Sequence, residues 1–238
     1  MSELCIELGG KAMQVYNLDL QELPLFRDVS PEEVERFITA TGATIERVGK
    51  GKRILEAYEE NHNIGVIVEG EAQVLTEDRF GNENVSHNLE RGAMVGSNSA
   101  IMPQIPNDTA IQALTTVLVL WIPYQALLTA GTKLGRTQGL VMKNMLEAFC
   151  KKNVLMVQKI KILSQKTLRE RLILYLLYKE QRQGKARVPV PGRVQLAKEL
   201  ECNRSALTRE ISSMQAEGLL RTGEDWMELD ATKIAAMD

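Results

Sequence analysis

Hydrophobic and polar positions divide the chain into stretches of different periodicity. From about residue 46 to 122, short apolar runs alternate with glycines, and Ile64, Val66 and Val68 recur at period two, which predicts a strand with one buried face. The run TTVLVLWIP (115–123) is apolar on both sides and predicts a fully buried strand. Several short strands at this spacing indicate a compact β-roll or barrel.

Helical patterns lie on both sides of this region. In SPEEVERFITA (30–40), Ser30 can cap a helix, Pro31 fits its first turn and Glu33 completes a capping box. KTLRERLILYLLYKEQRQGK predicts an amphipathic helix that ends near Gly184. After it, ARVPVPG can form only a short non-central strand, and GLLRTGEDWMELD predicts two brief strands around Gly223–Glu224.

A long helix is expected from about residue 137 to 163, with two apolar stripes. Two stripes need two covering surfaces, so we expect one of them to form a dimer seam; the alternative is a single helix buried on its own domain. Leu146, Cys150 and Val157 form the stripe available to the β-roll. The predicted seam, interrupted by Lys152 or Asn153, consists of Met142, Met145, Phe149, Met156, Ile160 and Leu163.

RVQLAKELECNRSALTREISSMQAEGLL (193–220) predicts two helices joined by a polar turn at about Glu201–Asn203. On the second helix, Leu207, Ile211 and Met214 share one side and are expected to pack on the first helix, against Leu196, Ala197 and Leu200. The opposite side is polar and lies at a helix N-terminus, which favours phosphate. This pattern is typical of a helix-turn-helix that enters the DNA major groove. The predicted DNA contacts are Asn203, Arg204, Ser205, Thr208 and Arg209.

The charge distribution supports DNA as the partner. The formal net charge is only −2, but residues 164–222 hold 12 Lys and Arg against 6 Asp and Glu. A basic block around a helix-turn-helix is the electrostatic footprint of nucleic-acid binding. A solvated basic face, or a helix-turn-helix that binds a protein partner instead of DNA, is the alternative.

The order of β-roll, long helix and winged helix-turn-helix resembles the cyclic-AMP receptor protein / fumarate-nitrate reduction regulator (CRP/FNR) family. The resemblance rests on VIVEGEAQVL, the hairpin at Gly81, ERGAMVG, LRERLILYLL and LAKELECNRSALTREISSMQAEGLL, and it covers about residues 20–235. It implies an α+β chain with a cyclic-nucleotide-binding-like β-roll (double-stranded jelly roll) that senses an effector at 1–133, a dimerisation helix at 134–163 and a DNA-binding domain at 164–238. It also implies a homodimeric transcription regulator on a near-palindromic operator, with the hairpin around Arg79–Asn84 as a candidate contact for RNA polymerase. Many relatives carry a glutamate where this chain has Ser205, which puts the usual half-site preference in doubt.

The expected effector is not a cyclic nucleotide. Relatives that bind one carry a Gly-Glu pair followed by Arg-Ser or Arg-Thr, whereas here Ser97 stands at the glutamate position and Asp108 at or beside the arginine position. No lysine or arginine occurs between Arg91 and Lys133, and burying a phosphodiester without a cation costs on the order of several kcal/mol. We expect an uncharged or weakly polar effector, or none, and no cyclic AMP. The expected pocket residues are Met94, Ser97, Asn98, Asp108, Thr109, Met156 and Val157.

Other chemistry is not expected. Cys5, Cys150 and Cys202 are scattered, which suits a reducing cytoplasm and cannot supply the four thiolates of an iron–sulfur cluster. His62 and His87 stand in no haem or metal motif, and no nucleophile–base pair or phosphate loop indicates an enzyme. No apolar run reaches the roughly 18–20 residues that span a bilayer. We therefore expect a cytoplasmic, bacterial protein without a cofactor, a metal site or a membrane partner.

Overall fold

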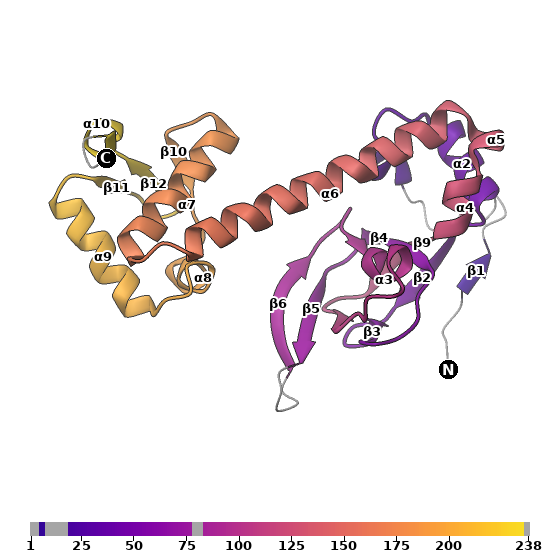
Figure 1. Ribbon diagram of the computed structural model, residues 1–238, viewed down its shortest axis with the longest axis horizontal. Coiled ribbons are helices and arrows are strands. Elements are labelled where there is room, and N and C mark those ends of the chain that lie inside the picture. The colour runs from indigo at the N-terminus through magenta and orange to yellow at the C-terminus, as the bar shows by residue number, and fades with distance from the viewer. Residues whose placement is uncertain (1–4, 8–18, 78–82, 236–238) are drawn as a thin grey trace. The chain divides into compact units, whose positions relative to one another are not determined.

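The computed structural model describes residues 5–7, 19–77 and 83–235, and the side chains of the last two ranges (Figure 1). The chain divides into two compact units, 1–148 and 149–238. Each unit has a hydrophobic core of its own. The predicted turn at Gly81, and most of the hairpin around Arg79–Asn84, lie outside the described residues.

The first unit is built on two antiparallel sheets. The five-stranded sheet has the order β1-β2-β9-β4-β7 and the four-stranded sheet has the order β3-β8-β5-β6. Apolar side chains from both sheets form one core, so the two sheets enclose it as a β-roll. The predicted α+β class and β-roll are confirmed. The strands are β1 (Cys5–Glu7), β2 (Thr44–Val48), β3 (Arg53–Leu55), β4 (Asn63–Glu69), β5 (Ala72–Glu77), β6 (Glu83–Leu89), β7 (Met94–Val95), β8 (Thr109–Ala113) and β9 (Val117–Pro123).

Strand β4 differs from its prediction. The period-two pattern of Ile64, Val66 and Val68 indicated one buried face, but Gly65 and Ile67 are buried as well. The strand lies between β9 and β7 inside the sheet, so it is not an edge. Gly65 is needed there because a Cβ at this position would lie 2.5 Å from Val95 and 2.6 Å from Trp121. By contrast, β9 is buried along most of its length, as its sequence predicts.

Helix α2 (Pro31–Thr41) has the predicted cap. The Ser30 hydroxyl accepts a hydrogen bond from the backbone N–H of Glu33 (3.3 Å), and the Glu33 carboxylate accepts one from the backbone N–H of Ser30 (3.0 Å). Short helices that the sequence did not indicate lie elsewhere in this unit: η1 (Leu20–Glu22), η2 (Pro24–Phe26), α3 (Ser97–Ile101), α4 (Tyr124–Thr129) and α5 (Gly131–Leu134).

Helix α6 (Arg136–Leu163) has the predicted bounds to within a residue and supplies residues to both units. Its first turns are fastened to the segment before α2. Asn144 is buried and its Nδ2 donates to the backbone carbonyls of Leu25 (3.0 Å) and Arg27 (2.8 Å). Val141 and Met145 are buried on the same side. This end of the helix is therefore part of the first unit.

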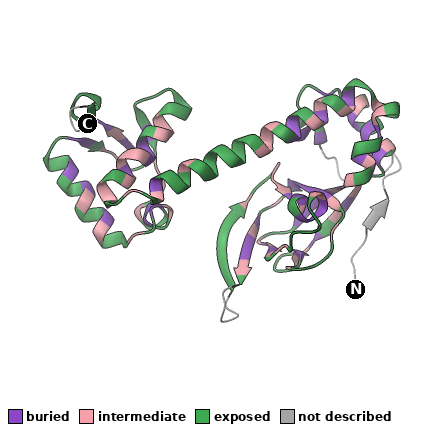
Figure 2. Cartoon of the chain, in the orientation of Figure 1, coloured by how far each residue is buried: buried purple, intermediate pink, exposed green. Residues whose placement is uncertain are grey.

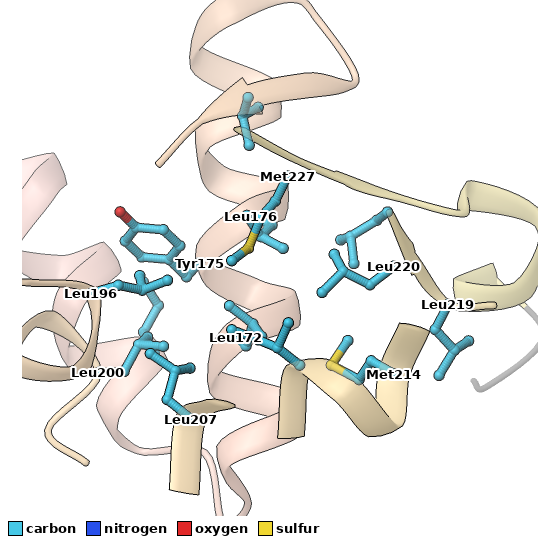
Figure 3. Close-up of a cluster of buried hydrophobic side chains, with 14 of the residues drawn as sticks. Leu172, Tyr175, Leu176, Leu196, Leu200, Leu207, Met214, Leu219, Leu220 and Met227 are labelled. Carbon is cyan, nitrogen blue, oxygen red and sulfur yellow. The ribbon is translucent and has the colours of Figure 1, made fainter. Parts of the chain in front are cut away.

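The described residues of the second unit form the rest of α6, four further helices and a three-stranded sheet of order β10-β12-β11. Strand β10 is an edge, as its prolines require. Side chains from α7, α8, α9 and the sheet meet in one core (Figure 3). The elements are α7 (Leu168–Gln183), β10 (Arg187–Pro189), α8 (Arg193–Glu199), α9 (Arg204–Ala216), β11 (Leu220–Thr222), β12 (Trp226–Leu229) and α10 (Ala231–Ala235).

Candidate nucleic-acid interface and sensor domain

Helices α8 and α9 are the two helices that the sequence predicts on either side of a polar turn. Leu207, Ile211 and Met214 on α9 are buried in the same core as Leu196, Ala197 and Leu200 (Figure 3). The chain reverses between the helices at Glu201, which adopts a left-handed conformation with φ of 50°. Each helix therefore presents one apolar side to the core, and the opposite side of α9 stays in solvent.

The solvent side of α9 holds all five predicted contact residues. Asn203, Arg204, Ser205, Thr208 and Arg209 are exposed and lie within the first two turns of the helix or at its N-cap (Figure 2). The buried and exposed positions follow the helical period that the sequence predicts. The structure thus brings these five side chains onto one exposed face.

Arg204 and Arg209 differ from the other arginines of this unit. Within the described part of the chain, no hydrogen bond or ion pair involves either guanidinium group. Five of the other six arginine side chains donate to an oxygen atom: Arg169, Arg171, Arg182, Arg187 and Arg221. Arg193, the sixth, is partly buried and contacts the thioether sulfur of Met227 at 4.0 Å. The two arginines on α9 are therefore available to bind something outside the subunit.

Two uncharged side chains complete this face. Asn203 is the N-cap of α9, but its side chain makes no capping hydrogen bond, so its amide is left to other partners. The Thr208 hydroxyl donates to the backbone carbonyl of Arg204 (2.9 Å), which leaves its oxygen as an acceptor and its methyl group exposed. The unpaired backbone N–H groups of the first turn of α9 also favour an anion.

Arg169 holds α9 in place and was not identified from the sequence. It lies in the first turn of α7, and its guanidinium donates to Glu210 (2.7 Å), Glu217 (2.6 and 2.7 Å) and Ser213 (3.3 Å). All three partners belong to the later part of α9 or its C-cap. No local pattern indicates these contacts, because Arg169 and Glu217 are 48 residues apart.

Tyr175 joins α7 to α8 in the same way. Its hydroxyl donates to the carboxylate of Glu199 (2.8 Å). Burial, and then the hydrogen bond to Glu199, raise the pKa of Tyr175 well above its usual range. Close by, Nη1 of Arg171 donates to the backbone carbonyl of Leu200 (3.3 Å). Helix α7 therefore fixes both helices of the helix-turn-helix through side-chain contacts.

The three-stranded sheet, which we call the wing, has β10 before α8 and has β11 and β12 after α9. Glu228 accepts hydrogen bonds from Arg221 (2.8 Å) and Arg187 (3.4 Å), and Arg187 also lies over the ring of Trp226, 4.0 Å from its centroid. Glu224 and Asp225 are exposed at the turn between the two strands. Both wing arginines thus share the single carboxylate of Glu228, which offsets one of their two charges, and the wing turn itself is acidic.

The predicted dimer seam is partly exposed. Met156 and Ile160 are 55% and 64% exposed, while Met142, Phe149 and Leu163 are partly buried. Met145 is only 3% exposed because it belongs to the core side of the first unit. Leu146, which we assigned to the stripe on the β-roll, is instead 59% exposed. The free stripe of α6 therefore contains Leu146 in place of Met145.

The residues expected to line an effector pocket fall into separate groups. Ser97 is buried at the start of α3, Asn98 beside it is exposed, and Met94 on β7 is partly buried. Asp108 is exposed, and Thr109 begins β8 in the other sheet, where its hydroxyl donates to Asn107 (2.8 Å). The remaining two, Met156 and Val157, belong to the second unit.

Uncharged groups hold α3 in place. Nδ2 of Asn61 donates to the carbonyls of Asn63 and Gly96 (both 2.8 Å) and approaches the hydroxyl of Ser99 (3.2 Å). Gly96 has φ of 68°, and a Cβ there would lie 2.7 Å from Nδ2 of Asn61. Asn61 stands in no motif, so no local pattern predicts this role. The fastening of α3 involves amides and hydroxyls.

Arg53 on β3, in the four-stranded sheet, is partly buried and was also not identified from the sequence. Its guanidinium contacts the carboxylates of Glu83 and Glu56, the latter at 3.6 Å. Nη1 of Arg53 is buried and has no hydrogen-bond partner among the described residues. Two carboxylates therefore already neutralise this charge.

Metal ligands, membrane-spanning helices and cavities bear on other functions that the described residues could have. Within those residues, no three His, Cys, Asp or Glu side chains gather in a way that could hold a metal ion. Among the same residues, no helix is long and apolar enough to cross a membrane. A cavity of about 430 Å³ lies in the second unit and includes none of the predicted effector residues; its lining is Leu177, Glu180, Gln181, Leu229, Ala231, Ile234 and Ala235.

Comparison with known proteins agrees with this architecture. Residues 45–131 match the family model of the cyclic nucleotide-binding domain. No curated protein matches the chain.

Solved structures extend the similarity to both units. The catabolite activator protein of Thermus thermophilus is 20% identical, with a TM-score of 0.51 over 90% of this chain and 96% of that one. CprK in complex with OCPA is 14% identical, with a TM-score of 0.62 over 84% and 91%. The c-di-GMP-responsive global regulator CLP of Xanthomonas campestris is 16% identical, with a TM-score of 0.54 over 84% and 99%.

The resemblance to CRP/FNR regulators is confirmed at the level of the fold. The chain therefore has the fold of the catabolite activator protein, and its residues 45–131 match the model of the cyclic nucleotide-binding domain family.

Proposed function

We propose that this chain is a sequence-specific DNA-binding transcription regulator that acts as a homodimer on a near-palindromic operator. The observation that carries the proposal is the pair of arginines, Arg204 and Arg209, on the exposed side of α9. Both are without a partner among the described residues, in a unit whose other arginines are engaged. Guanidinium groups read guanine through two hydrogen bonds to O6 and N7 in the major groove.

The face of α9 suggests a role for each residue. The second helix of a helix-turn-helix points its N-terminal residues at base edges, so Arg204 and Arg209 are assigned to guanines. Asn203 and Ser205 contact bases or phosphates. Thr208 already donates its proton to the backbone, so it suits a base amino group or the methyl group of thymine.

We assign the three roles of such a regulator to three consecutive segments of the chain. Residues 1–133 sense a signal, 134–163 pair two subunits, and 164–238 bind DNA. In such a dimer the two recognition helices are related by a two-fold axis and lie about 34 Å apart, one turn of DNA. The two-fold axis requires an operator with two inverted half-sites, and the spacing places these half-sites one turn of DNA apart.

The signal in this proposal is an uncharged or weakly polar molecule, or the protein works without one. Residues 45–131 match a cyclic nucleotide-binding domain, yet they offer no lysine or arginine between Arg91 and the end of the match. Asn61, an uncharged amide, holds the loop at Gly96. Calorimetric titration with cyclic AMP should give no heat of binding; micromolar binding would overturn this part of the proposal.

A protein partner for α9 is the second candidate, and the exposed Glu224 and Asp225 at the wing turn favour it. Carboxylates beside α9 oppose a phosphate backbone and suit a basic protein surface. Ionic strength separates the two candidates. Affinity for DNA falls with a log–log slope of about −0.9 for each phosphate contacted.

The test of the proposed function is selection of bound duplexes from a random DNA pool. The expected result is an enriched sequence with two inverted half-sites, bound with the steep salt dependence of phosphate contacts. The selection is repeated with cell extract to supply a missing trigger. Failure to enrich any sequence under either condition would contradict DNA binding.

A further inference from the structure

Two neighbouring loops of the first unit expose a group of apolar side chains. One loop follows β3 and the other precedes β8, the strand that pairs with β3. The backbone N–H of Tyr58 in the first loop donates to the carbonyl of Asn107 in the second (2.6 Å), so the two loops lie side by side. Tyr58 is 67% exposed, Ile105 55% and Met102 39%. These three side chains and two exposed prolines form a surface that we call the loop patch: Tyr58, Met102, Pro103, Ile105 and Pro106.

Tyr58 is not explained by the folding of its own loop. Its φ is 62°, in the left-handed region, which strains a residue that carries a Cβ and favours glycine. Its ring lies mostly in solvent, so packing does not offset the strain. No hydrogen bond or ion pair joins its side chain to any residue that the structure describes. An aromatic ring kept at a strained and exposed position indicates a contact outside the subunit.

Hydrogen bonds hold the second loop in one conformation. The backbone N–H of Ile105 donates to the carbonyl of Met102 (3.0 Å). Nδ2 of Asn107 donates to the carbonyl of Thr109, and the hydroxyl of Thr109 donates to Oδ1 of Asn107 (both 2.8 Å). The apolar side chains are therefore presented by a fixed backbone, so little ordering is needed when a partner binds.

The loop patch is flanked by carboxylates. Glu59 and Glu60 lie in the first loop, Asp108 ends the second, and all three are exposed. Within the described ranges, none of these three carboxylates has a hydrogen bond or an ion pair. Residues 54–78 and 92–132 contain no lysine or arginine. The two loops therefore carry negative charge without a cation of their own.

Arg53, which directly precedes the first loop, does not supply that cation. Its guanidinium contacts the carboxylates of Glu83 and Glu56, the latter at 3.6 Å. The charge beside the loop patch thus stays negative. It repels the phosphate groups of nucleic acids and lipids, and it attracts a basic surface.

We propose that the loop patch is a docking surface for a basic segment of another protein. In this complex an arginine of the partner stacks on the ring of Tyr58 and pairs with the flanking carboxylates, because a guanidinium group does both. An apolar side chain of the same segment covers Met102 and Ile105. A metal ion or a polyamine would use the carboxylates but leave these two side chains in water. The proposal concerns the first unit and does not depend on DNA binding by α9.

Selection from a random peptide display library tests this proposal. The full-length protein is the target, and Tyr58→Gly protein removes peptides that bind elsewhere. The expected peptides contain an arginine close to an apolar residue. A synthetic copy of an enriched peptide should bind Tyr58→Gly about tenfold more weakly in fluorescence anisotropy, since the ring and its cation contact are lost. Failure to enrich any peptide, enrichment of peptides without a basic residue, or equal affinity for Tyr58→Gly would overturn the proposal.

The thermal unfolding midpoint separates lost binding from misfolding. Tyr58→Gly should raise the midpoint, because the substitution relieves the left-handed strain and removes no buried side chain. A lowered midpoint would mean that the ring serves the fold, and it would overturn the proposal. Sedimentation should give the same oligomeric state for Tyr58→Gly and the unmodified protein. A difference would show that the patch joins copies of this chain, which also contradicts a separate partner.

A matched pair of charge variants tests the role of the carboxylates. Glu59→Gln/Glu60→Gln should weaken binding of the synthetic peptide and reduce its dependence on salt. Glu22→Gln/Glu35→Gln removes the same charge from exposed positions on η1 and α2, and should bind the peptide like the unmodified protein. Equal effects of the two double variants would contradict recognition of a basic segment at the loop patch.

Discussion

Arg169 and Glu217 form a doubly hydrogen-bonded ion pair between the first turn of α7 and the C-terminal end of α9. Nη1 and Nη2 of the guanidinium donate to the two carboxylate oxygens at 2.6 and 2.7 Å. Two parallel bonds fix direction as well as distance. The pair therefore ties down the end of α9 opposite the one that holds Arg204.

Removal of the guanidinium at residue 169 should loosen α9. We expect Arg169→Gln to lower the thermal midpoint of the second unit and to weaken discrimination between DNA sequences. The midpoint and the discrimination of Arg169→Lys should lie between those of the unmodified protein and of Arg169→Gln. Arg182→Gln is the control, since Arg182 lies at the far end of α7 and contacts Gln158. Equal effects of the Arg169 and Arg182 substitutions would argue against this role.

The same pair predicts a response to acid. The hydrogen bonds from Arg169 and Ser213 lower the pKa of Glu217. A carboxylate with a lowered folded pKa contributes stability that is complete above its unfolded pKa, about 4.3, and is lost as pH falls through the folded value. Unfolding followed from pH 6 down to 2 should show this loss in the unmodified chain. The Arg169→Gln chain should show a smaller loss, because only Ser213 still lowers the pKa of Glu217, and parallel acid curves would contradict the assignment.

Leu207 is the apolar anchor of α9, with no exposed surface. Leu207→Ala should lower the free energy of unfolding of the second unit by about 2–5 kcal/mol, the cost of a cavity in a packed core. Ser205→Ala, two residues away on the exposed side, should change it by less than about 0.5 kcal/mol. Urea denaturation, followed by the fluorescence of Trp226 in a Trp121→Phe background, measures both. A small effect at Leu207 would mean that α9 is not held by this core.

Alanine substitutions at Gly70 and Gly42 distinguish the cost of backbone strain from the cost of a steric clash. Both have positive φ, 86° and 64°, but a Cβ on Gly70 would lie 2.3 Å from the carbonyl oxygen of Thr116, whereas nothing lies within 4 Å of one on Gly42. Gly42→Ala should destabilise the first unit by about 1–2 kcal/mol, the left-handed penalty alone. Gly70→Ala should cost more, because the neighbour is backbone and cannot rotate away. Trp121 fluorescence in a Trp226→Phe background reports the difference, and equal costs would contradict it.

The raised pKa of Tyr175 predicts that the second unit loses folding stability at alkaline pH. Its pKa is raised from 10.0 by burial and by Glu199, so its contribution is complete below pH 10 and is lost as pH rises beyond that value toward the folded pKa. Tyr175→Phe should shift the alkaline unfolding midpoint of this unit to higher pH. At neutral pH the same substitution should cost about 1 kcal/mol for the lost hydrogen bond. Tyr58→Phe, in the first unit, serves as the control, and an identical shift there would contradict the role of Tyr175.

Local signals in the sequence predicted most of the architecture. The capping box at Ser30 and Glu33, the left-handed Gly184 that ends α7, and the apolar stripe of Leu207, Ile211 and Met214 depend on neighbours within a few residues. Such features are encoded by period and cap chemistry. The position of the five polar residues on one side of α9 follows from the same period.

Contacts between distant segments could not be predicted in this way. Arg169 with Glu217, Tyr175 with Glu199, and Asn61 with Gly96 join residues far apart in sequence, and no spacing rule relates them. Two further observations depend on which surface packs against an element. One is the burial of Gly65 and Ile67 on β4, and the other is the burial of Met145 instead of Leu146 on α6. Period alone identifies an apolar side but does not identify what covers it.

The central claim is that Arg209 reads a base in duplex DNA. Competition binding on the selected operator, on single-base variants of it and on random DNA compares Arg209→Ala with Arg182→Ala. We expect Arg209→Ala to lose about 1–3 kcal/mol on the operator and to relax discrimination at one base pair. Arg182→Ala should bind like the unmodified protein. An equal loss on operator and random DNA, or no binding of the unmodified protein to any duplex, would contradict the account.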